Sequence, residues 1–367
     1  MRALGLVLTL TVLLAGCQRP SEVNFDLSQP MPQNLSELSL FSLDEGNIQY
    51  SRRVIPYALS APLFSDYALK ERAIYVPDGV RAEAEGSGVL SFPVGTIIIK
   101  SFVYPKDMRT PDVERTFIET RLLVRYASGW KPFPFVWNEE QTEAVLQVEG
   151  DVRDIEFIGA DGEPKEATYL IPQKNQCFEC HEMKDEAGRR YNTPIGPRPR
   201  YLNRTIEWQG ASVHQLDLLV SSGLLQSRPT LTAEESATEM DAFFEMDNPT
   251  VEQIDKAARD YLDINCAHCH RPNGISGITS QLFLNIENTD LFHLGYCKRP
   301  GSAGEGTGGL EFDIVPGSPE DSILYYRVDT ENVGAMMPMI GRSLRHDKGA
   351  ELIRQWIQNM PIESCKE

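Results

Sequence analysis

The chain has 367 residues, of which 41% are hydrophobic and 24% are charged, and its formal net charge is −18. This length exceeds the usual size of one domain, so we expect two or three folded units, and the composition is that of a folded protein. Nucleic-acid binding needs clustered Lys and Arg against the phosphates, so the acidic charge argues against a nucleic-acid partner.

The first seventeen residues are predicted to be a targeting signal rather than part of the fold. Arg2 precedes an apolar run from Ala3 to Leu14, which is too short to span a bilayer as a helix. The run ends in LAGC at Cys17, and this resembles a bacterial lipoprotein signal in which Cys17 is lipidated. The lipid would anchor the protein on the periplasmic side of the cell envelope, and Gln18 favours the outer membrane over the inner one. An ordinary secretory signal is the alternative.

Two segments are predicted to connect folded units. Residues 18–50 are rich in Ser and Asn and contain Pro20, Pro30 and Pro32, which disfavour regular elements. They are expected to tether the lipid-modified cysteine to the rest of the chain. Residues 236–249 are acidic and polar, and we expect a linker there.

Residues 51–170 carry the signals of a mostly antiparallel β-rich domain. A β-branched run lies at Thr96–Ile99, residues 115–133 have a strand–turn–strand pattern, and a hairpin is expected to turn at Asp161-Gly162. The region has no His and no Cys, which removes the commonest metal ligands and the commonest acid–base group. Its aromatic cluster is expected in the core, with a sugar- or partner-binding surface as the alternative: Trp130, Phe133, Phe135 and Trp137.

Residues 171–235 begin with the sequence CFECH from Cys177 to His181. Prolines and a glycine between positions 191 and 204 exclude long regular elements there. Further along, SVHQLDLLVSSGLL predicts a short amphipathic helix that ends near Gly223.

The segment 250–367 is predicted to be helical at both ends. Thr250 begins the pattern of a capping box, and the helix that follows would run directly into Cys266. A second helix is expected to begin at Asp347 and to stop at Pro361. Loops are predicted between the two helices.

The pattern C-x-x-C-H occurs twice, at Cys177, Cys180 and His181 and at Cys266, Cys269 and His270. Covalent haem attachment needs two thiols at this spacing, which add to the two porphyrin vinyl groups, and then an imidazole as the proximal iron ligand. We therefore expect one haem c at each motif. A four-cysteine zinc site would leave both histidines unexplained, and redox-active disulfides would favour a βαβ context that is not predicted here.

The helix leading into Cys266, the sequence CHRPNG and the closing helix resemble a class I cytochrome c domain. The resemblance implies a downstream methionine as sixth iron ligand, and the first choice is Met337 in GAMMPMIGRS. Met336 and Met339 compete with it, and filling gaps in a core is the alternative role for all three. His268 is expected to point away from the iron, as a surface residue or as a support for a ligand.

The sixth ligand of the first haem has no evident owner. His214 lies on the predicted short helix at a suitable spacing, whereas Met183 follows His181 too closely to reach the other face of the ring. Met240 and Met246 stay open as ligands. A five-coordinate iron is also open, and it would leave a position for catalysis or for ligand sensing.

Two cysteines remain once the motifs and the lipidation site are assigned, namely Cys297 and Cys365. An even number in an oxidising compartment favours a disulfide between them. It would close a loop of about 69 residues and contribute roughly 4 kcal/mol to stability in the chain-entropy description. Two unpaired thiols are the alternative.

Several stretches extend the resemblance beyond a single haem domain, among them APLFSDYALKERAIYVPDG, FPVGTIIIKSFVYPKD, IPQKNQCFECH and YLDINCAHCHRPNG. Together they resemble a largely uncharacterised family of bacterial dihaem c-type cytochromes that are often lipoproteins. The match covers about residues 50 to 360, and its most specific part runs from Gly295 to Val328. The resemblance implies haem c at both motifs and electron transfer between redox partner proteins in the cell envelope.

The sequence thus predicts a multidomain fold in which the β domain, 51–170, precedes α-helical, cytochrome c-like haem domains at 171–235 and 250–367. The expected function is electron transfer by two haems. Two alternatives stay open: a dihaem peroxidase or oxidase with an open first haem, and a redox subunit whose β domain binds a partner dehydrogenase or a sugar.

Overall fold

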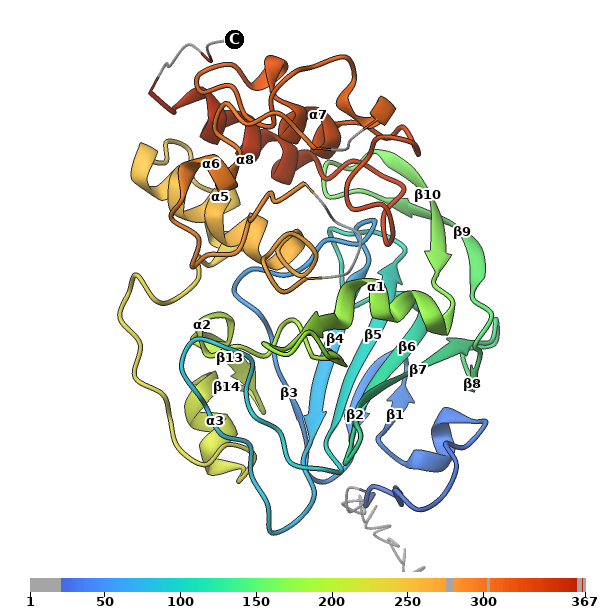
Figure 1. Ribbon diagram of the computed structural model, residues 1–367. Coiled ribbons are helices and arrows are strands. Elements are labelled where there is room, and N and C mark those ends of the chain that lie inside the picture. The colour runs from blue at the N-terminus through green and yellow to red at the C-terminus, as the bar shows by residue number, and fades with distance from the viewer. Residues whose placement is uncertain (1–20, 275–279, 302–303, 362–364, 366–367) are drawn as a thin grey trace, which may run out of the picture.

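The computed structural model describes residues 21–274, 280–301, 304–361 and 365, and its centre is a six-stranded antiparallel sheet (Figure 1). The strands lie side by side in chain order: β3 (Val54–Pro56), β4 (Leu69–Tyr75), β5 (Ile97–Pro105), β6 (Arg115–Tyr126), β7 (Gly129–Trp137) and β8 (Ala144–Leu146). The three longest strands, β5 to β7, are rich in β-branched and aromatic residues, which suit a pleated, buried surface.

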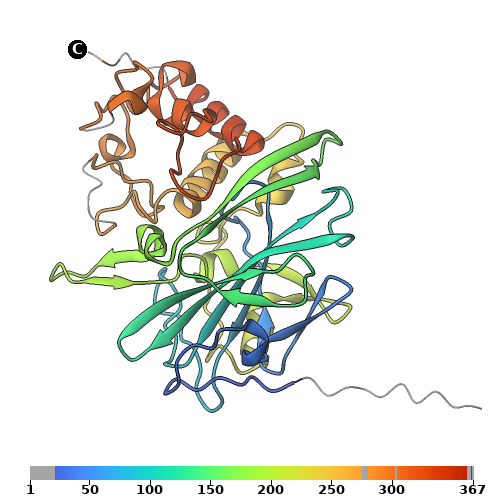
Figure 2. The same cartoon turned by 90° about the vertical axis from the view of Figure 1, so that its right-hand side faces the viewer.

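Two-stranded antiparallel hairpins surround this sheet in the described part of the chain. They are β1 (Phe41–Asp44) with β2 (Asn47–Tyr50), β9 (Asp151–Ile158) with β10 (Pro164–Ile171), β11 (Glu182–Lys184) with β12 (Arg190–Asn192), and β13 (Thr205–Trp208) with β14 (Ala211–His214). The predicted hairpin at Asp161-Gly162 is the turn between β9 and β10. In Figure 2, β9 and β10 reach from the sheet to the helical end of the molecule. Lys165 on β10 pairs there with Asp347 at 3.6 Å.

The helices are short. They are α1 (Cys177–His181), α2 (Pro199–Leu202), α3 (Gln215–Ser221), α4 (Met240–Phe244), α5 (Val251–Asn265), α6 (Leu291–Leu294), α7 (Ile323–Asp329) and α8 (Asp347–Gln358), with 3-10 turns η1 (Leu35–Leu38), η2 (Lys174–Gln176), η3 (Gly304–Thr307) and η4 (Pro319–Asp321). The predicted capping box of α5 is formed, because Gln253 N donates to Thr250 Oγ1 at 3.2 Å and Thr250 N donates to Gln253 Oε1 at 2.8 Å. Helix α5 ends at Asn265, one residue before the second motif.

One face of the sheet is covered by the N-terminal residues of the described chain. Leu35, Leu38 and Leu40 are buried in a cluster with apolar side chains of the sheet such as Ile97 and Phe117. The segment 18–50 was expected to be a tether, but from residue 21 onward it folds against the sheet. Its leucines bury apolar surface, and this outweighs the local preference of Ser, Asn and Pro for irregular chain.

The opposite face carries two separate apolar clusters. The larger cluster joins Ile74, Ile98 and Leu123 of the sheet to buried residues of α3, α5 and α8. The smaller cluster joins the sheet to β9 and β10 through residues such as Phe102, Tyr104 and Tyr169. Charged side chains of β4, β5 and β6 lie between the two clusters. The segment 236–249, expected to be a linker, also contributes buried residues, because Met240 and Phe243 of α4 belong to the larger cluster.

The predicted fold class is wrong. We expected an N-terminal mostly antiparallel β domain followed by α-helical cytochrome c-like haem domains. Strand accounts for 27% of the structure, whereas helix accounts for only 22% in eight short helices, and no cytochrome c-like helical haem domain is evident in the described residues. The segment 171–235 forms two hairpins besides its short helices, and α5 and α8 share their core with the sheet instead of closing a separate helical unit.

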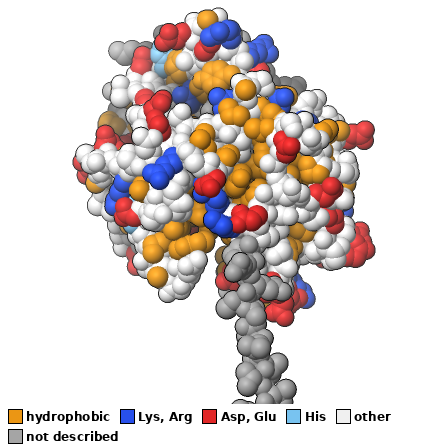
Figure 3. All heavy atoms as spheres, turned by 90° about the horizontal axis from the view of Figure 1, so that it is seen from below, with side chains coloured by type: hydrophobic (Ala, Val, Ile, Leu, Met, Phe, Trp, Pro, Cys, Tyr) orange, Lys and Arg blue, Asp and Glu red, His pale blue; other side chains and the backbone are white. Residues whose placement is uncertain are grey.

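No helix in the described part of the chain combines the length and the apolar character needed to span a bilayer. Figure 3 views the end of the molecule that lies opposite α5 and α8, and hydrophobic side chains gather in the middle of this face with acidic and basic ones around them. The described chain starts near this end (Figure 1), where the Ser21 and Ser51 hydroxyl groups lie 2.7 Å apart.

Candidate haem-binding site

The first motif forms α1, which lies over the sheet in front of β5 and β6 (Figure 1). Strand β10 and turn η2 deliver the chain to α1, and hairpin β11–β12 carries it away. The last residue of the motif is fixed to the chain segment that precedes α2, because Thr193 N donates to the carbonyl of His181 at 2.8 Å. The short helix therefore has a defined place on the sheet in spite of having only five residues.

The second motif follows the C-terminal end of α5, which is held by buried polar contacts. Asn265 Oδ1 accepts a hydrogen bond from Phe64 N at 2.8 Å, which ties the helix end to the loop before β4. Asp263 Oδ2 pairs with Arg198 Nη1 at 2.7 Å, and Asp263 Oδ1 accepts from Ile286 N at 2.8 Å. These contacts join three distant chain segments around the start of the motif.

The two motifs contact each other. Cys269 Sγ donates to the carbonyl of Glu179 at 3.2 Å, and the thiols of Cys180 and Cys269 lie within hydrogen-bonding reach of each other. The contact with the neighbouring Cys269 thiol lowers the pKa of Cys180, and the contact with Cys180 raises the pKa of Cys269. His268 also faces Cys180, and its side chain is only 9% exposed, so it is not the surface residue that was one expectation.

A cavity of 290 Å³ opens beside this contact. It is lined by both motifs and by the loop before α8: Cys180, Cys266, His268, Cys269, His270, Met337 and Met339. Its other walls are largely apolar and include Leu282, Leu284, Ile323, Leu324, Val328 and Ile340. The cavity walls carry three thiols, two imidazoles and two thioethers, and these include the donor types that a c-type haem requires, namely two thiols, one imidazole and one thioether.

Met337 is fixed in this cavity wall by its backbone. Met337 N donates to the carbonyl of Arg327 at 2.8 Å, and Arg342 Nη1 donates to the carbonyl of Val328 at 2.8 Å. The loop is therefore tied to α7 on both sides of the methionine. The two competing methionines differ, because Met339 lines the cavity but is 62% exposed and Met336 is buried outside its lining.

His181 has the tautomer that an iron ligand needs, and both motif histidines are neutral. His181 Nδ1 lies 2.8 Å from the carbonyl oxygen of Thr193. A carbonyl only accepts, so Nδ1 carries the proton and Nε2 keeps its lone pair. Burial lowers the pKa of His181, and burial together with the neighbouring His268 lowers the pKa of His270 to about 4. Both rings are therefore neutral near pH 7.

The structure does not bring His214 to the first motif. It lies at the end of β14, well away from α1 (Figure 1), and its Nε2 is 3.3 Å from Arg228 Nη2. Met240 is buried in α4 and Met246 is 45% exposed, and neither lines a cavity that contains a motif residue. Met183 of β11 does line a second cavity of 370 Å³, together with Cys180 and His268.

The remaining predicted cysteines fall in two places. Cys297 and Cys365 form a disulfide in the structure, which joins the loop after α6 to the chain beyond α8. Cys17, the predicted lipidation site, lies outside the described residues.

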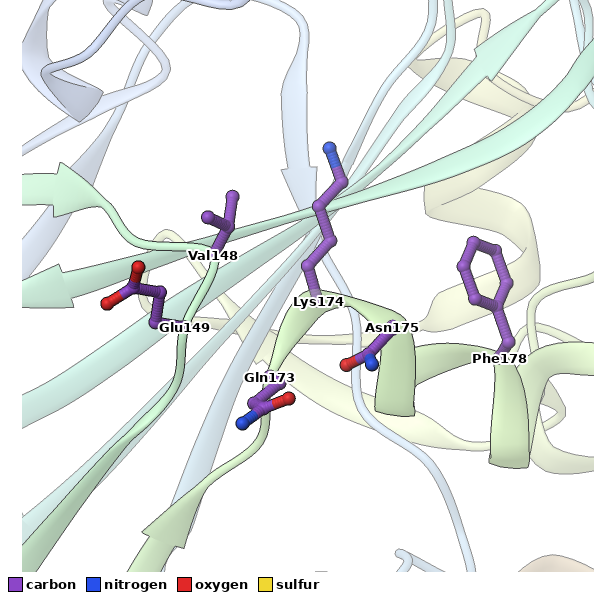
Figure 4. A pocket seen from close by; sticks show the side chains of 6 residues that line it. All are labelled: Val148, Glu149, Gln173, Lys174, Asn175 and Phe178. Carbon is purple, nitrogen blue, oxygen red and sulfur yellow. The ribbon is translucent and has the colours of Figure 1, made fainter.

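A shallow hollow of 660 Å³ lies on the solvent side of the first motif (Figure 4). Figure 4 shows Lys174, Asn175 and Phe178 on η2 and α1, with Val148 and Glu149 on the loop before β9. None of the motif cysteines or histidines lines it, so it is separate from the candidate haem cavity.

The geometry gives no support to the zinc alternative. Within the described ranges, no three His, Cys, Asp or Glu side chains are grouped so that they could hold a bare metal ion. Sequence reasoning missed two features of the site, namely the burial of His268 and the contact between Cys180 and Cys269. The sequence offered no signal for the contact, because it joins residues far apart in the chain.

Comparison with known proteins found no match, since no protein-family model, no curated protein and no solved structure is significantly similar to this chain.

Proposed function

We propose that the protein is a dihaem c-type cytochrome that transfers electrons in the bacterial cell envelope. One observation carries the proposal: a single cavity is lined by Cys266, Cys269, His270 and Met337 and also by Cys180 of the other motif. The proposal thus rests on residues 180, 266–270 and 337, which the fold gathers from distant parts of the chain.

The residues of the two motifs have separate roles in this proposal. Cys177 and Cys180 would form the thioethers of the first haem, and Cys266 and Cys269 those of the second haem. His181 and His270 would be the proximal ligands through Nε2, and Met337 would be the distal ligand at the second motif. When bound, the haems supply one-electron chemistry. The largely apolar cavity wall would limit contact between the second haem and water, which would favour the reduced form.

The contact between the motifs supports electron exchange between the two sites. Cys180 and Cys269 are attachment points for different haems, and their thiols are neighbours. The two cofactors would therefore be bonded to adjacent points of the protein, and an electron that enters at one site would have a short route to the other.

A lipid on Cys17 would orient the molecule in the envelope. The described chain starts near the end of the molecule seen in Figure 3, whereas the second motif follows α5 toward the other end (Figure 1). The lipid-proximal end would face the outer membrane, and the haem sites would be accessible to redox partner proteins in the periplasm.

A dihaem peroxidase or oxidase is the second candidate. The observation that favours it is that none of the described residues His214, Met240 and Met246 lines either of the two cavities that contain Cys180. A five-coordinate first haem would bind substrate or peroxide.

Electron paramagnetic resonance of the purified, oxidised protein separates the two candidates. Electron transfer predicts two low-spin haems that do not respond to cyanide. A high-spin signal from one haem that disappears when cyanide is added would establish the enzyme candidate and overturn the proposal.

A further inference from the structure

A row of cationic side chains crosses the face of the sheet that carries α1. Lys70 and Arg72 lie on β4, Lys100 on β5 and Arg121 on β6, and we call these four residues the cationic band. Lys100 is the cross-strand partner of both Arg72 and Arg121, so the three side chains point to the same face. The band separates the two apolar clusters of this face.

The charges of the band converge on one ring. Phe102 is buried, and three cations lie over it, with Lys70 Nζ at 5.8 Å from the ring centroid, Lys100 Nζ at 4.7 Å and Arg121 Cζ at 4.4 Å. Contact with an aromatic face stabilises a cation only modestly. It does not offset the repulsion among three like charges in one place.

The described residues around the band do not provide enough carboxylates to balance its positive charge. Arg121 pairs with the buried Glu119, whose Oε2 lies 2.8 Å from Arg121 Nε. Lys70 donates only to the carbonyl of Ala68, at 2.8 Å. The ammonium group of Lys100 forms no hydrogen bond or ion pair with a described residue.

Arg72 supplies a second, independent sign of a missing partner. Arg72 is only 8% exposed, and its Nη2 nitrogen is buried without a hydrogen-bond acceptor among the described residues. Buried guanidinium nitrogens are expensive to leave unpaired. Burial and the neighbouring cations lower the pKa of both lysines, and an anion held in the band would act in the opposite direction, stabilising their charged forms.

The band lies beneath the first motif. Lys100 is near enough to Cys180 and His181 to influence the pKa of His181, and Arg121 is similarly near Cys177. An anion held by the band would therefore lie next to the first haem site.

We propose that the cationic band is a binding site for carboxylates or similar oxyanions at the first motif. The anion has two sources of the same chemistry: the propionate groups of a haem carried by Cys177 and Cys180, or a free small oxyanion. The first source rests on the proposed function, whereas the second does not.

The test compares Lys100→Met and Lys70→Met with the exposed Lys131→Met on β7 as a matched control, each in the full chain with its cofactors. Far-UV circular dichroism and the covalent haem content first establish that each variant is folded and loaded. Two measurements follow on each protein, a potentiometric titration of the haems and a calorimetric titration with inorganic sulfate.

If propionates occupy the band, Lys100→Met lowers the potential of one haem, because loss of a positive charge disfavours the reduced form, and sulfate does not bind. If a free oxyanion occupies it, sulfate binds the wild-type protein, and its affinity falls about tenfold in Lys100→Met. Lys131→Met changes neither quantity.

The site is disproved if folded Lys100→Met and Lys70→Met match the wild-type protein in both measurements. A chain without covalent haem would refute the proposed function, while the sulfate titration still tests the band.

Discussion

Met337, which lines the cavity beside the second motif, is the proposed sixth ligand of the second haem, whereas no such residue is assigned to the first haem. Met337→Ala is predicted to abolish the charge-transfer band of a methionine bound to ferric haem and to lower the potential of that haem, while both thioethers stay intact. Optical spectra of the oxidised protein measure the band. Met339→Ala is the matched control, because Met339 lines the same cavity but is largely exposed. A band that survives in Met337→Ala and disappears in Met339→Ala would assign the ligand to Met339.

Asp260 shows how a buried charge on α5 stabilises the molecule. Its carboxylate is fully buried and accepts from Arg200, from Thr238 N at 2.7 Å and from Lys256 Nζ at 2.9 Å. Asp260→Asn leaves Arg200 buried without its counter-charge, so we expect a loss of about 3 kcal/mol in the free energy of unfolding. Urea denaturation measures this.

The control for that substitution is Asp217→Asn, which removes an ion pair of the same kind from the surface. The pair of Asp217 with Arg228 is about half exposed, and the expected loss is below about 1 kcal/mol. Equal losses in Asp260→Asn and Asp217→Asn would show that burial does not increase the contribution of the Asp260 contacts to stability.

The local spacing C-x-x-C-H singled out residues that the structure partly brings together, because Cys180, Cys266, Cys269 and His270 line one cavity. The sequence did not predict features that depend on contacts between residues far apart in the chain. Lys100 lies inside the apolar run IIIKSFV, and a charged residue within a buried strand was a signal of the proposed anion site. Only the strand register shows that Arg72 and Arg121 are its neighbours.

At the scale of elements, α8 is joined to α5 and to the loop before β4 through His346. Its ring stacks on Phe64 at 4.2 Å between centroids, and its Nδ1 lies 3.0 Å from the Tyr261 hydroxyl. Burial, with the charges of Lys70 and Arg342, lowers the pKa of His346 to about 3, against the opposing effect of Asp347. Lys348 also acts to lower it.

The depressed pKa of His346 makes stability depend on pH in a defined direction. The unfolded chain binds the proton near pH 6.5 and the folded chain only near pH 3, so this stabilisation is present above pH 6.5 and is lost as the pH falls toward 3. At pH 5 the contribution already lost is about 2 kcal/mol.

His346→Gln should therefore lose less unfolding free energy than wild type between pH 7 and pH 5. Urea denaturation at both pH values measures the difference. Identical pH dependence in His346→Gln and wild type would contradict the assignment.

Elements with strong local signals were predictable. Helix α5 has its capping box, α8 begins at Asp347 as expected, and strand β5 covers the β-branched run. Residues 21–50 and hairpin β11–β12 were not predicted. Residues 21–50 are ordered by packing on the distant sheet, and hairpin β11–β12 is held by hydrogen bonds from Lys184 N to the carbonyl of Asn273 and from Asn192 Nδ2 to the carbonyl of Trp130. The same long-range packing explains why helical haem domains were wrongly expected.

At the scale of the whole molecule, the disulfide between Cys297 and Cys365 constrains the C-terminal third of the chain. The two cysteines are 68 residues apart in the sequence. Replacing both by Ser is predicted to lower the free energy of unfolding by up to about 4 kcal/mol, mainly by releasing the unfolded chain. Guanidinium denaturation of the oxidised wild-type protein and the double variant measures it. Coincident unfolding curves would show that the bridge does not stabilise the fold.

An alkaline pyridine spectrum measures the covalent haem that the proposed function requires at both motifs, in protein exported and matured in a host that attaches haem c. We expect two haems per chain in the wild-type protein and one in each of the double variants Cys177→Ala/Cys180→Ala and Cys266→Ala/Cys269→Ala. Folded wild-type protein without covalent haem would contradict the proposed function.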